Sequence, residues 1–167
     1  MTDQASGPEK NRVARSFGKA AVSYDDVAIL QRDTADEMLE RLDLVKINPQ
    51  HILDLGTGTG RNLHLLQQRY PAARQVAVDI APAMLNQARQ RYLKDQGLRR
   101  WLPGQKSPLF IAGDAEQLPL ADNSVDLVYA NLALQWCDLT SVFAEIQRVL
   151  RPGGLLMFST LGPDTLQ

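Results

Sequence analysis

The chain has 167 residues, the size of one domain, and its 44% hydrophobic and 22% charged residues are typical of a globular protein that buries a core. Its formal net charge of −1 gives no general attraction to nucleic acid or to an anionic membrane, so neither is expected as a partner. The single cysteine, Cys137, excludes an internal disulfide and any zinc site built from several cysteines.

The N-terminal part of the chain is expected to be helical and to carry no targeting segment. Its first ten residues are polar, and no apolar run approaches the ~18 residues that span a bilayer, so we expect a cytoplasmic protein. A basic helix is predicted over residues 9–21 and a second helix over 25–42, before an Asn-Pro pair interrupts the pattern. This break separates a predicted N-terminal helical segment, residues 1–48, from a predicted core, residues 49–167.

A short apolar run followed by closely spaced glycines is the most informative stretch of the sequence. Residues 51–55 read as a buried strand that carries Asp54, and glycines follow at positions 56, 58 and 60, directly before a helical pattern. A strand, a glycine turn and a helix N-terminus in this order point backbone N–H groups at a ligand. An ordinary strand-to-helix turn needs fewer glycines, so we expect a binding site here.

The remainder of the chain alternates between predicted helices and strands. Helices are expected from the glycine turn to Pro71, over residues 82–96, and after a capping Asp138, the last of them ending at Arg151-Pro152-Gly153-Gly154. Further strands are predicted over residues 75–80, 109–112, 124–130 and 155–160. Because these strands are apolar throughout, we expect an α/β fold with a doubly wound, mostly parallel sheet covered on both faces.

Polar residues stand where the predicted strands end. The glycine turn follows the first strand, Asp79 ends the second, Asp114 follows the third and Asn131 follows the fourth. The carboxyl ends of parallel strands meet at one edge of the sheet, where ligands bind in such folds. The glycine spacing excludes two common nucleotide sites, since Arg61 occupies the third glycine position of the G-x-G-x-x-G fingerprint and the Lys-Ser/Thr of a phosphate-binding loop is missing.

The segment from Asp54 to Gly60 resembles the first motif of class I S-adenosylmethionine-dependent methyltransferases. The similarity continues at Asp79, at Gly113-Asp114-Ala115 and at residues 150–154, so that it covers residues 50–161. It implies a Rossmann-like fold in which the N-terminal helices, residues 1–48, lie over the cofactor. Since about five of the usual seven strands are predicted, we expect a C-terminally truncated fragment, or an unusually reduced protein, that binds the cofactor but is poorly active alone.

The resemblance also implies roles for individual residues. Asp79 would accept from the two ribose hydroxyls, Asp114 from the adenine amino group, and a Cβ at Gly56 or Gly58 would intrude on the cofactor. The implied cofactor-binding residues are Tyr24, Asp54, Gly56, Thr57, Gly58, Gly60, Asp79, Ile80, Asp114, Ala115, Asn131 and Gln135. Structural roles stay open for several of them: a helix-capping or surface acid at Asp79, an Asx turn at Asp114, and helix packing at Tyr24.

Residues 15–24, 131–136 and 159–167 are similar to a narrower family, the malonyl-acyl carrier protein O-methyltransferases of biotin synthesis. This resemblance implies transfer of a methyl group to the free carboxylate of a malonyl thioester, an acceptor that is already ionised at neutral pH and needs no general base. Accordingly, no catalytic residue and no metal ligand is predicted, and both histidines are expected to be structural or exposed. An acidic carrier protein as substrate would favour basic residues near the site, such as Arg89, Lys94, Arg99 and Arg100.

Other functions stay open on the sequence. The acceptor could instead be a small molecule, a quinone or RNA, although the near-neutral charge counts against RNA. The ending of the chain also resembles complex I assembly factors, one of which works as a protein hydroxylase, and a non-catalytic cofactor-binding scaffold is a third alternative. The oligomeric state is not indicated by any feature of the sequence.

Overall fold

A computed structural model of the chain describes residues 29–97 and 106–162. Its elements are, in order, α3 (Ile29–Arg41), a 3-10 turn (Leu42–Leu44), β1 (His51–Leu55), α4 (Arg61–Arg69), β2 (Arg74–Asp79), α5 (Pro82–Gln96), β3 (Leu109–Ala112), β4 (Val125–Asn131), a second 3-10 turn (Leu134–Trp136), α6 (Leu139–Val149) and β5 (Leu150–Ser159). The predicted helix over residues 9–21 lies outside the described residues.

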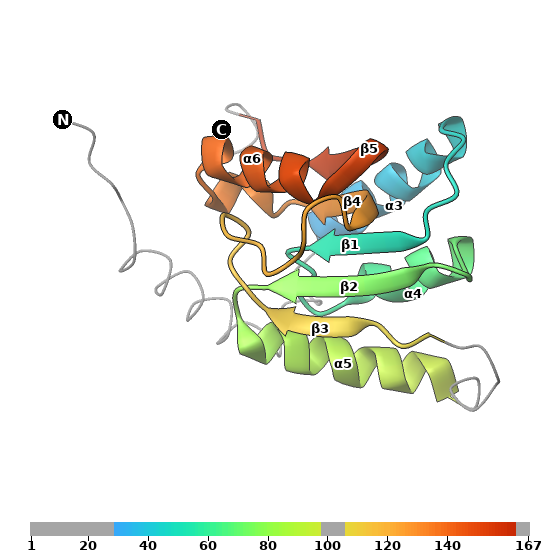
Figure 1. Cartoon of the computed structure of the whole chain (residues 1–167). Helices are drawn as coiled ribbons and strands as arrows, with labels where there is room; N and C mark the ends of the chain where they lie inside the picture. Colours follow the sequence, from blue (N-terminus) through green and yellow to red (C-terminus); the bar gives the residue numbers. More distant parts are fainter. Residues whose placement is uncertain (1–28, 98–105, 163–167) are drawn as a thin grey trace.

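The strands form one five-stranded sheet in the order β3-β2-β1-β4-β5, and every neighbouring pair is parallel (Figure 1). From β1 the chain winds outward through α4, β2, α5 and β3, and it then returns to place β4 on the other side of β1. The predicted doubly wound parallel sheet is therefore confirmed, and its strand order reverses between β1 and β4. Such a reversal opens a crevice beyond the carboxyl ends of the two strands.

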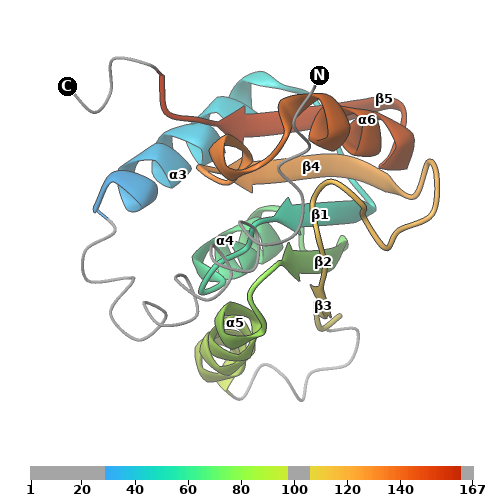
Figure 2. The ribbon, with the colours of Figure 1, turned by 90° about the vertical axis from the view of Figure 1, so that its left-hand side faces the viewer.

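Helices cover both faces of the sheet, with α3, α4 and α5 on one face and α6 on the other (Figure 2). Alternate residues of β1 serve the two layers, because successive side chains of a strand point to opposite faces. Ile52 packs with Met38 of α3 and Leu66 of α4, whereas Leu53 packs in the cluster that contains Ile146 of α6. The core thus fixes β1, and with it the start of the glycine turn, between two apolar layers.

The predicted element boundaries agree closely with the structure except at the last strand. Strands β1 and β3 and helix α5 have the predicted bounds, and β2 and β4 are shifted by one residue. The prediction that residues 151–154 end a helix before a strand at 155 is wrong, because β5 begins at Leu150. Its pairing with β4 passes from Val125↔Leu150 to Leu127↔Leu155, so the Arg-Pro-Gly-Gly segment forms a bulge within the strand.

Glycine explains why this bulge is possible. Gly153 has a φ of +81°, and a Cβ on Gly154 would lie 2.9 Å from the carbonyl oxygen of Arg151. The bulge places the Arg151 side chain next to Asp126 of β4, where its Nη1 donates to Asp126 Oδ1 at 2.8 Å. Asp126 Oδ2 also accepts the backbone N–H groups of Gln50 and His51, both at 2.8 Å. This cluster joins β1, β4 and β5 at the amino-terminal edge of the sheet, opposite the predicted site.

Candidate functional site

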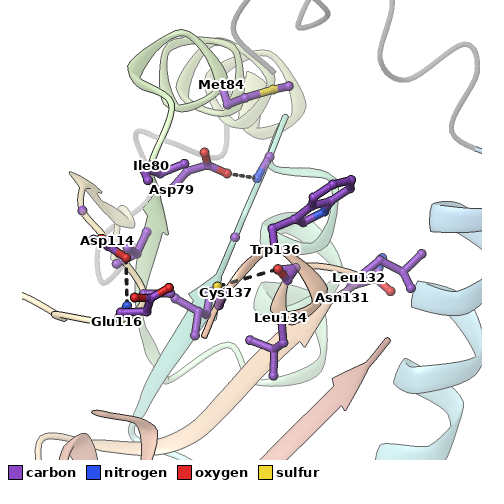
Figure 3. Close-up of a pocket in the computed structure, with 17 residues that line it drawn as sticks. Asp79, Ile80, Met84, Asp114, Glu116, Asn131, Leu132, Leu134, Trp136 and Cys137 are labelled. Carbon is purple, nitrogen blue, oxygen red and sulfur yellow. Dashed lines mark hydrogen bonds between the residues drawn. The ribbon is translucent and has the colours of Figure 1, made fainter. Parts of the chain in front are cut away.

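A pocket lies at the carboxyl edge of the sheet, over the point where the strand order reverses (Figure 3). Its lining comes from the ends of β1, β2 and β4, the loop after β3 and the first turn of α5: Leu55, Gly56, Gly58, Val78, Asp79, Ile80, Met84, Gly113, Asp114, Ala115, Glu116, Asn131, Leu132, Ala133, Leu134, Trp136 and Cys137. Seven predicted site residues therefore line one pocket: Gly56, Gly58, Asp79, Ile80, Asp114, Ala115 and Asn131.

The three glycines of the turn have different structural tasks, although all have a positive φ. A Cβ on Gly56 would lie 2.4 Å from the Cβ of Ala133, so this glycine admits the loop after β4. A Cβ on Gly60 would lie 2.7 Å from the Cβ of Ala88, so this glycine lets α4 approach α5. Gly58 has a φ of +55°, and among the described residues no atom lies within 4 Å of an added Cβ. Gly58 is thus the position where a side chain would enter the pocket itself.

Asp79 holds the glycine turn in place from the end of β2. Its Oδ2 accepts the backbone N–H of Gly58 at 2.9 Å, and its Oδ1 accepts the N–H of Ala81 at 2.8 Å. Burial raises the pKa of this carboxyl, and the two N–H donors oppose that shift. Asp79 therefore serves as a structural acceptor and lines the pocket at the same time, because each carboxylate oxygen can accept more than one hydrogen bond.

Asp54 lies behind the pocket wall, beneath the glycine turn. It is only 1% exposed, and Thr57 Oγ1 donates to its Oδ2 at 2.5 Å. Desolvation raises the pKa of Asp54 to about 7, against the effect of the Thr57 hydroxyl and with a further contribution from the charge of Asp79. Asp54, Thr57 and Gly60 are absent from the pocket lining, so the contacts they make in the structure shape the turn.

The loop after β3 brings acidic side chains to the other end of the pocket. Asp114 Oδ1 accepts the N–H of Glu116 at 2.9 Å, and the N–H of Gln117 donates to the Asp114 carbonyl at 3.1 Å. The Asx turn that the sequence left open at Asp114 is therefore present, and Asp114 lines the pocket as well. In Figure 3, Asp79, Asp114 and Glu116 lie along one side of the pocket, and Asn131 and Leu132 lie along the other.

The segment after β4 forms a strained corner at the pocket. Leu132 has a φ of +49°, which is unusual for leucine, and its N–H donates to Ser159 Oγ at 3.0 Å. Both ends of the Asn131 amide are used within the protein: Nδ2 donates to the Gln31 carbonyl of α3 at 2.8 Å, and Oδ1 accepts from Ser159 Oγ at 2.7 Å. Asn131 thereby joins α3 to the pocket, and its side chain supports the wall.

A 3-10 turn that the sequence did not predict continues this wall. Leu134 is fully buried as its anchor, whereas Trp136 lines the pocket and is 55% exposed. Gln135 does not line the pocket, and Tyr24 lies outside the described residues. Met84 and Glu116 also line the pocket, although neither was predicted as a site residue. Met84 lies in the first turn of α5, and the start of this helix at Pro82 was predicted.

Neither histidine lines the pocket. His51 lies at the amino-terminal edge beside Asp126, and His64 Nε2 lies 2.8 Å from Gln68 Nε2 on the surface of α4. Within residues 29–97 and 106–162, no group of three or more His, Cys, Asp or Glu side chains is placed to hold a metal ion. In the same ranges, no helix has the length and apolar character that a membrane span requires.

Comparisons with known proteins agree with this geometry. A family described as a methyltransferase domain matches residues 53–158. A malonyl-[acyl-carrier protein] O-methyltransferase of Laribacter hongkongensis is 48% identical over 160 residues, covering 95% of this chain and 53% of the relative. Its counterpart from Methylovorus sp. is 49% identical over 168 residues, covering 100% of this chain and 55% of the relative. The chain thus spans about half the length of these curated relatives.

Solved structures show the same fold. A putative methyltransferase in complex with the Haloferax volcanii Trm112 activator has a TM-score of 0.69 and 27% identity, covering 86% of this chain and 59% of that one. A putative S-adenosyl-L-methionine-dependent methyltransferase of Methanococcus maripaludis has a TM-score of 0.65 at 19% identity, covering 96% of this chain and 68% of that one. The sheet, its helices and the position of the crevice are therefore those of the Rossmann-like class I fold.

Proposed function

Because this chain belongs to the methyltransferase-domain family, we propose that it binds S-adenosylmethionine in the pocket at the carboxyl edge of its sheet and takes part in methyl transfer. The observation that supports this most directly is the arrangement around Gly58. None of the described residues would contact a Cβ on this glycine, and the carboxylate of Asp79 lies within hydrogen-bond distance of its N–H. The backbone of Gly58 and the carboxylate of Asp79 therefore border the same pocket. S-adenosylmethionine needs both, because its ribose is joined directly to its methionine part.

Different residues of the pocket are assigned to the ribose, the adenine and the methionine part of S-adenosylmethionine. Asp79 is assigned to the ribose hydroxyls, with the lone pairs that Gly58 and Ala81 leave available. Asp114 and the N–H of Ala115 are assigned to the edge of the adenine, whose faces would pack against apolar residues such as Ile80 and Leu134. The backbone of Gly56 and Gly58 is assigned to the methionine part, next to the corner that Asn131 supports.

The methyl acceptor is proposed to be the free carboxylate of malonyl-[acyl-carrier protein], because the curated relatives are named for this substrate. S-adenosylmethionine supplies a methyl group on a positively charged sulfur, and the methyl passes to a carboxylate oxygen while the carbon–sulfur electron pair stays on sulfur. The carboxylate is ionised at neutral pH, so no protein base is required. The task of this chain is to align the reactants and exclude water, for which the apolar walls at Leu132 and Trp136 are suited.

Calorimetric titration of the chain with S-adenosylhomocysteine and, separately, with NAD tests the cofactor assignment. We expect saturable binding of S-adenosylhomocysteine and no binding of NAD, because Arg61 stands where the dinucleotide fingerprint has its third glycine. Binding of NAD alone would falsify the proposal. Product analysis with labelled S-adenosylmethionine and malonyl-acyl carrier protein, on a chain of the relatives' full length, then tests the acceptor.

An acidic carrier protein would be attracted by basic residues beside the pocket. Met84 in the first turn of α5 lines the pocket, and the same helix carries Arg89 and Lys94 on its exposed surface. Arg99 and Arg100 lie outside the described residues. Charge reversal at Arg89 and Lys94 is expected to raise KM for a carrier-bound substrate and to leave KM for a small malonyl thioester unchanged. An equal change for both substrates would exclude α5 as the docking surface.

A further inference from the structure

Arg148 lies on α6, outside the pocket, and three of its hydrogen bonds join α6 to the loop after β3, whereas two go to Glu145 on α6 itself. Nη2 donates to the carbonyl of Leu118 at 3.0 Å, and Nη1 donates to the carbonyl of Leu120 at 2.7 Å. Nη1 also donates to Asp122 Oδ1 at 2.8 Å. Nε and Nη2 each donate to one oxygen of Glu145 at 2.7 Å, in the forked geometry that a guanidinium permits.

Glu145 closes the same network from the other side. Its Oε2 accepts the backbone N–H of Leu118 at 2.7 Å, and the hydrogen bond from Arg148 lowers the pKa of Glu145. Leu118 itself is 4% exposed and packs in the core cluster of α6. The two ends of one buried residue are thus fixed by two side chains of one helix, so Leu118 has a single position relative to α6.

The position of Leu118 is passed on to the pocket by short contacts within the loop. The loop folds back on itself, since a Cβ on Gly113 would lie 3.1 Å from Pro119 Cδ and the N–H of Gln117 donates to the Asp114 carbonyl. Glu116 Oε1 accepts the N–H of Asp138, the residue that caps α6. A shift of residues 118–120 would therefore move Asp114 and its neighbours in the pocket wall.

We propose that Arg148 is a positioning residue. Together with Glu145, it fixes the positions of Asp114 and Ala115 and thereby the hydrogen bonds that these residues make to the adenine edge of the cofactor. The inference rests on the proposed function, because it takes adenosine as the ligand of this wall. Lysine keeps the charge of arginine but lacks the planar fork, so Arg148→Lys separates charge from geometry. Glu145→Gln, which keeps the shape of the partner, is a second and milder variant.

The test compares the affinities of S-adenosylhomocysteine and S-inosylhomocysteine, which differ at the amino group that Asp114 is proposed to read. Arg148→Lys is expected to reduce the affinity for S-adenosylhomocysteine roughly tenfold, which corresponds to the loss of about one hydrogen bond. The affinity for the inosine analogue should change much less. Arg74→Lys, at an exposed arginine on the opposite edge of the sheet, is the matched control and is expected to change neither affinity. Hydrogen exchange at the Leu118 amide should become faster in the lysine variant.

A double-mutant cycle decides whether Arg148 acts through Asp114. In an Asp114→Ala background, Arg148→Lys is expected to have little further effect on S-adenosylhomocysteine, because the group it positions is already missing. Equal losses for both ligands, or additive losses in the cycle, would overturn the inference in favour of a merely structural role. Should the wild-type chain bind neither nucleoside, the proposed function fails first, and that outcome is distinct from a wild type that binds and a variant that binds equally well.

Discussion

At the scale of single residues, two carboxylates of different environment hold the glycine turn. Asp79 is on the pocket side and accepts two backbone N–H groups, whereas Asp54 is buried beneath the turn and accepts the Thr57 hydroxyl. Desolvation raises the pKa of both carboxyls, against two backbone N–H donors at Asp79 and one hydroxyl donor at Asp54. Because only Asp79 lines the pocket, ligand binding tests the role of Asp79, and the pH dependence of stability tests the role of Asp54.

Asp79→Asn is expected to reduce the affinity for S-adenosylhomocysteine at least about tenfold, as measured by calorimetric titration. The amide carries only one oxygen, so its NH₂ would face the N–H of Gly58 or of Ala81, and the turn would lose an acceptor that it needs. Asp95→Asn, at an exposed position of α5, is the control and should bind like the wild type. An Asp79→Asn protein with wild-type affinity would contradict the assignment of this acid.

Asp54→Asn is expected to change how stability depends on pH. The folded-state pKa of Asp54 is about 7 instead of 3.8, so between these values the folded state binds a proton that the unfolded state has released. The free energy of unfolding therefore falls as the pH rises from about 4 to 7, by an amount on the order of a few kcal/mol. The asparagine variant should lose most of this slope in urea titrations at pH 5 and pH 8. A slope identical to that of the wild type would refute the assignment.

The position of a residue along the chain was enough to predict which side chains lie at the carboxyl edge of the sheet. Asp79 and Asp114 were expected at one edge because both follow strand ends, and both line the pocket. The hydrogen-bond partners of the side chains could not be predicted. The Asn131 amide, for example, bonds to Gln31 and Ser159, which are remote from it in sequence. Glu116 enters the pocket wall only because the loop turns back at Asp114, a conformation that composition does not reveal.

At the scale of elements, the glycine turn is where β1, α4 and α5 meet. Gly60 begins α4 with a φ of +77° and stands against Ala88 on α5. The small residues on both elements allow the close contact that sets the direction of α4. The third glycine thus belongs to helix packing, and the first two belong to the pocket.

Gly60→Ala is expected to destabilise the fold by about 2–4 kcal/mol. The new Cβ would lie 2.7 Å from the Cβ and 2.8 Å from the Cα of Ala88, and alanine also disfavours the left-handed backbone at this position. Gly153→Ala is the control, because Gly153 has a φ of +81°, close to that of Gly60, and among the described residues no atom lies within 4 Å of an added Cβ. It should lose only the backbone contribution, about 1–2 kcal/mol, in the same denaturant titration. Equal losses at both positions would show that the contact with α5 carries no weight.

The elements themselves were largely predictable, because their signals are local. Pro82 marks the start of α5, and Asp138 caps α6 by accepting the N–H of Ser141. The start of β5 was mispredicted since Arg151-Pro152-Gly153-Gly154 reads locally as a helix end. Its pairing as a bulged strand depends on Asp126 and Val125 of the neighbouring β4, which no local pattern contains.

At the scale of the whole molecule, the sheet has a binding edge and a stabilising edge. The carboxyl edge holds the pocket, with a buried acid of raised pKa and a leucine in a left-handed conformation. The amino-terminal edge holds the cluster of Asp126, Arg151 and His51, which joins three strands. The two edges therefore differ: the carboxyl edge carries the pocket, and the amino-terminal edge carries a hydrogen-bonded network that joins strands.

Asp126→Asn is expected to lower the free energy of unfolding at pH 7 by about 1–3 kcal/mol, since the carboxylate accepts from Arg151 and from the backbone of Gln50 and His51. Partial burial alone would raise the pKa of Asp126, but these donors together lower it below 3.8. A carboxyl whose pKa is lower in the folded state than in the unfolded state stabilises the fold at pH values above its unfolded-state pKa. This contribution is lost as the pH falls through the folded-state pKa. The difference between wild type and variant in urea titrations should therefore shrink below about pH 4.

Asp33→Asn, at an exposed position of α3, is the control for this experiment and should follow the wild type at both pH values. The variant should also leave S-adenosylhomocysteine binding at pH 7 nearly unchanged, because Asp126 lies at the edge opposite the pocket and is absent from its lining. Loss of binding without loss of stability would mean that the two edges are coupled through β4. A constant stability difference from pH 7 to pH 3 would instead show that the charge of Asp126 does not contribute, and that packing alone joins the three strands.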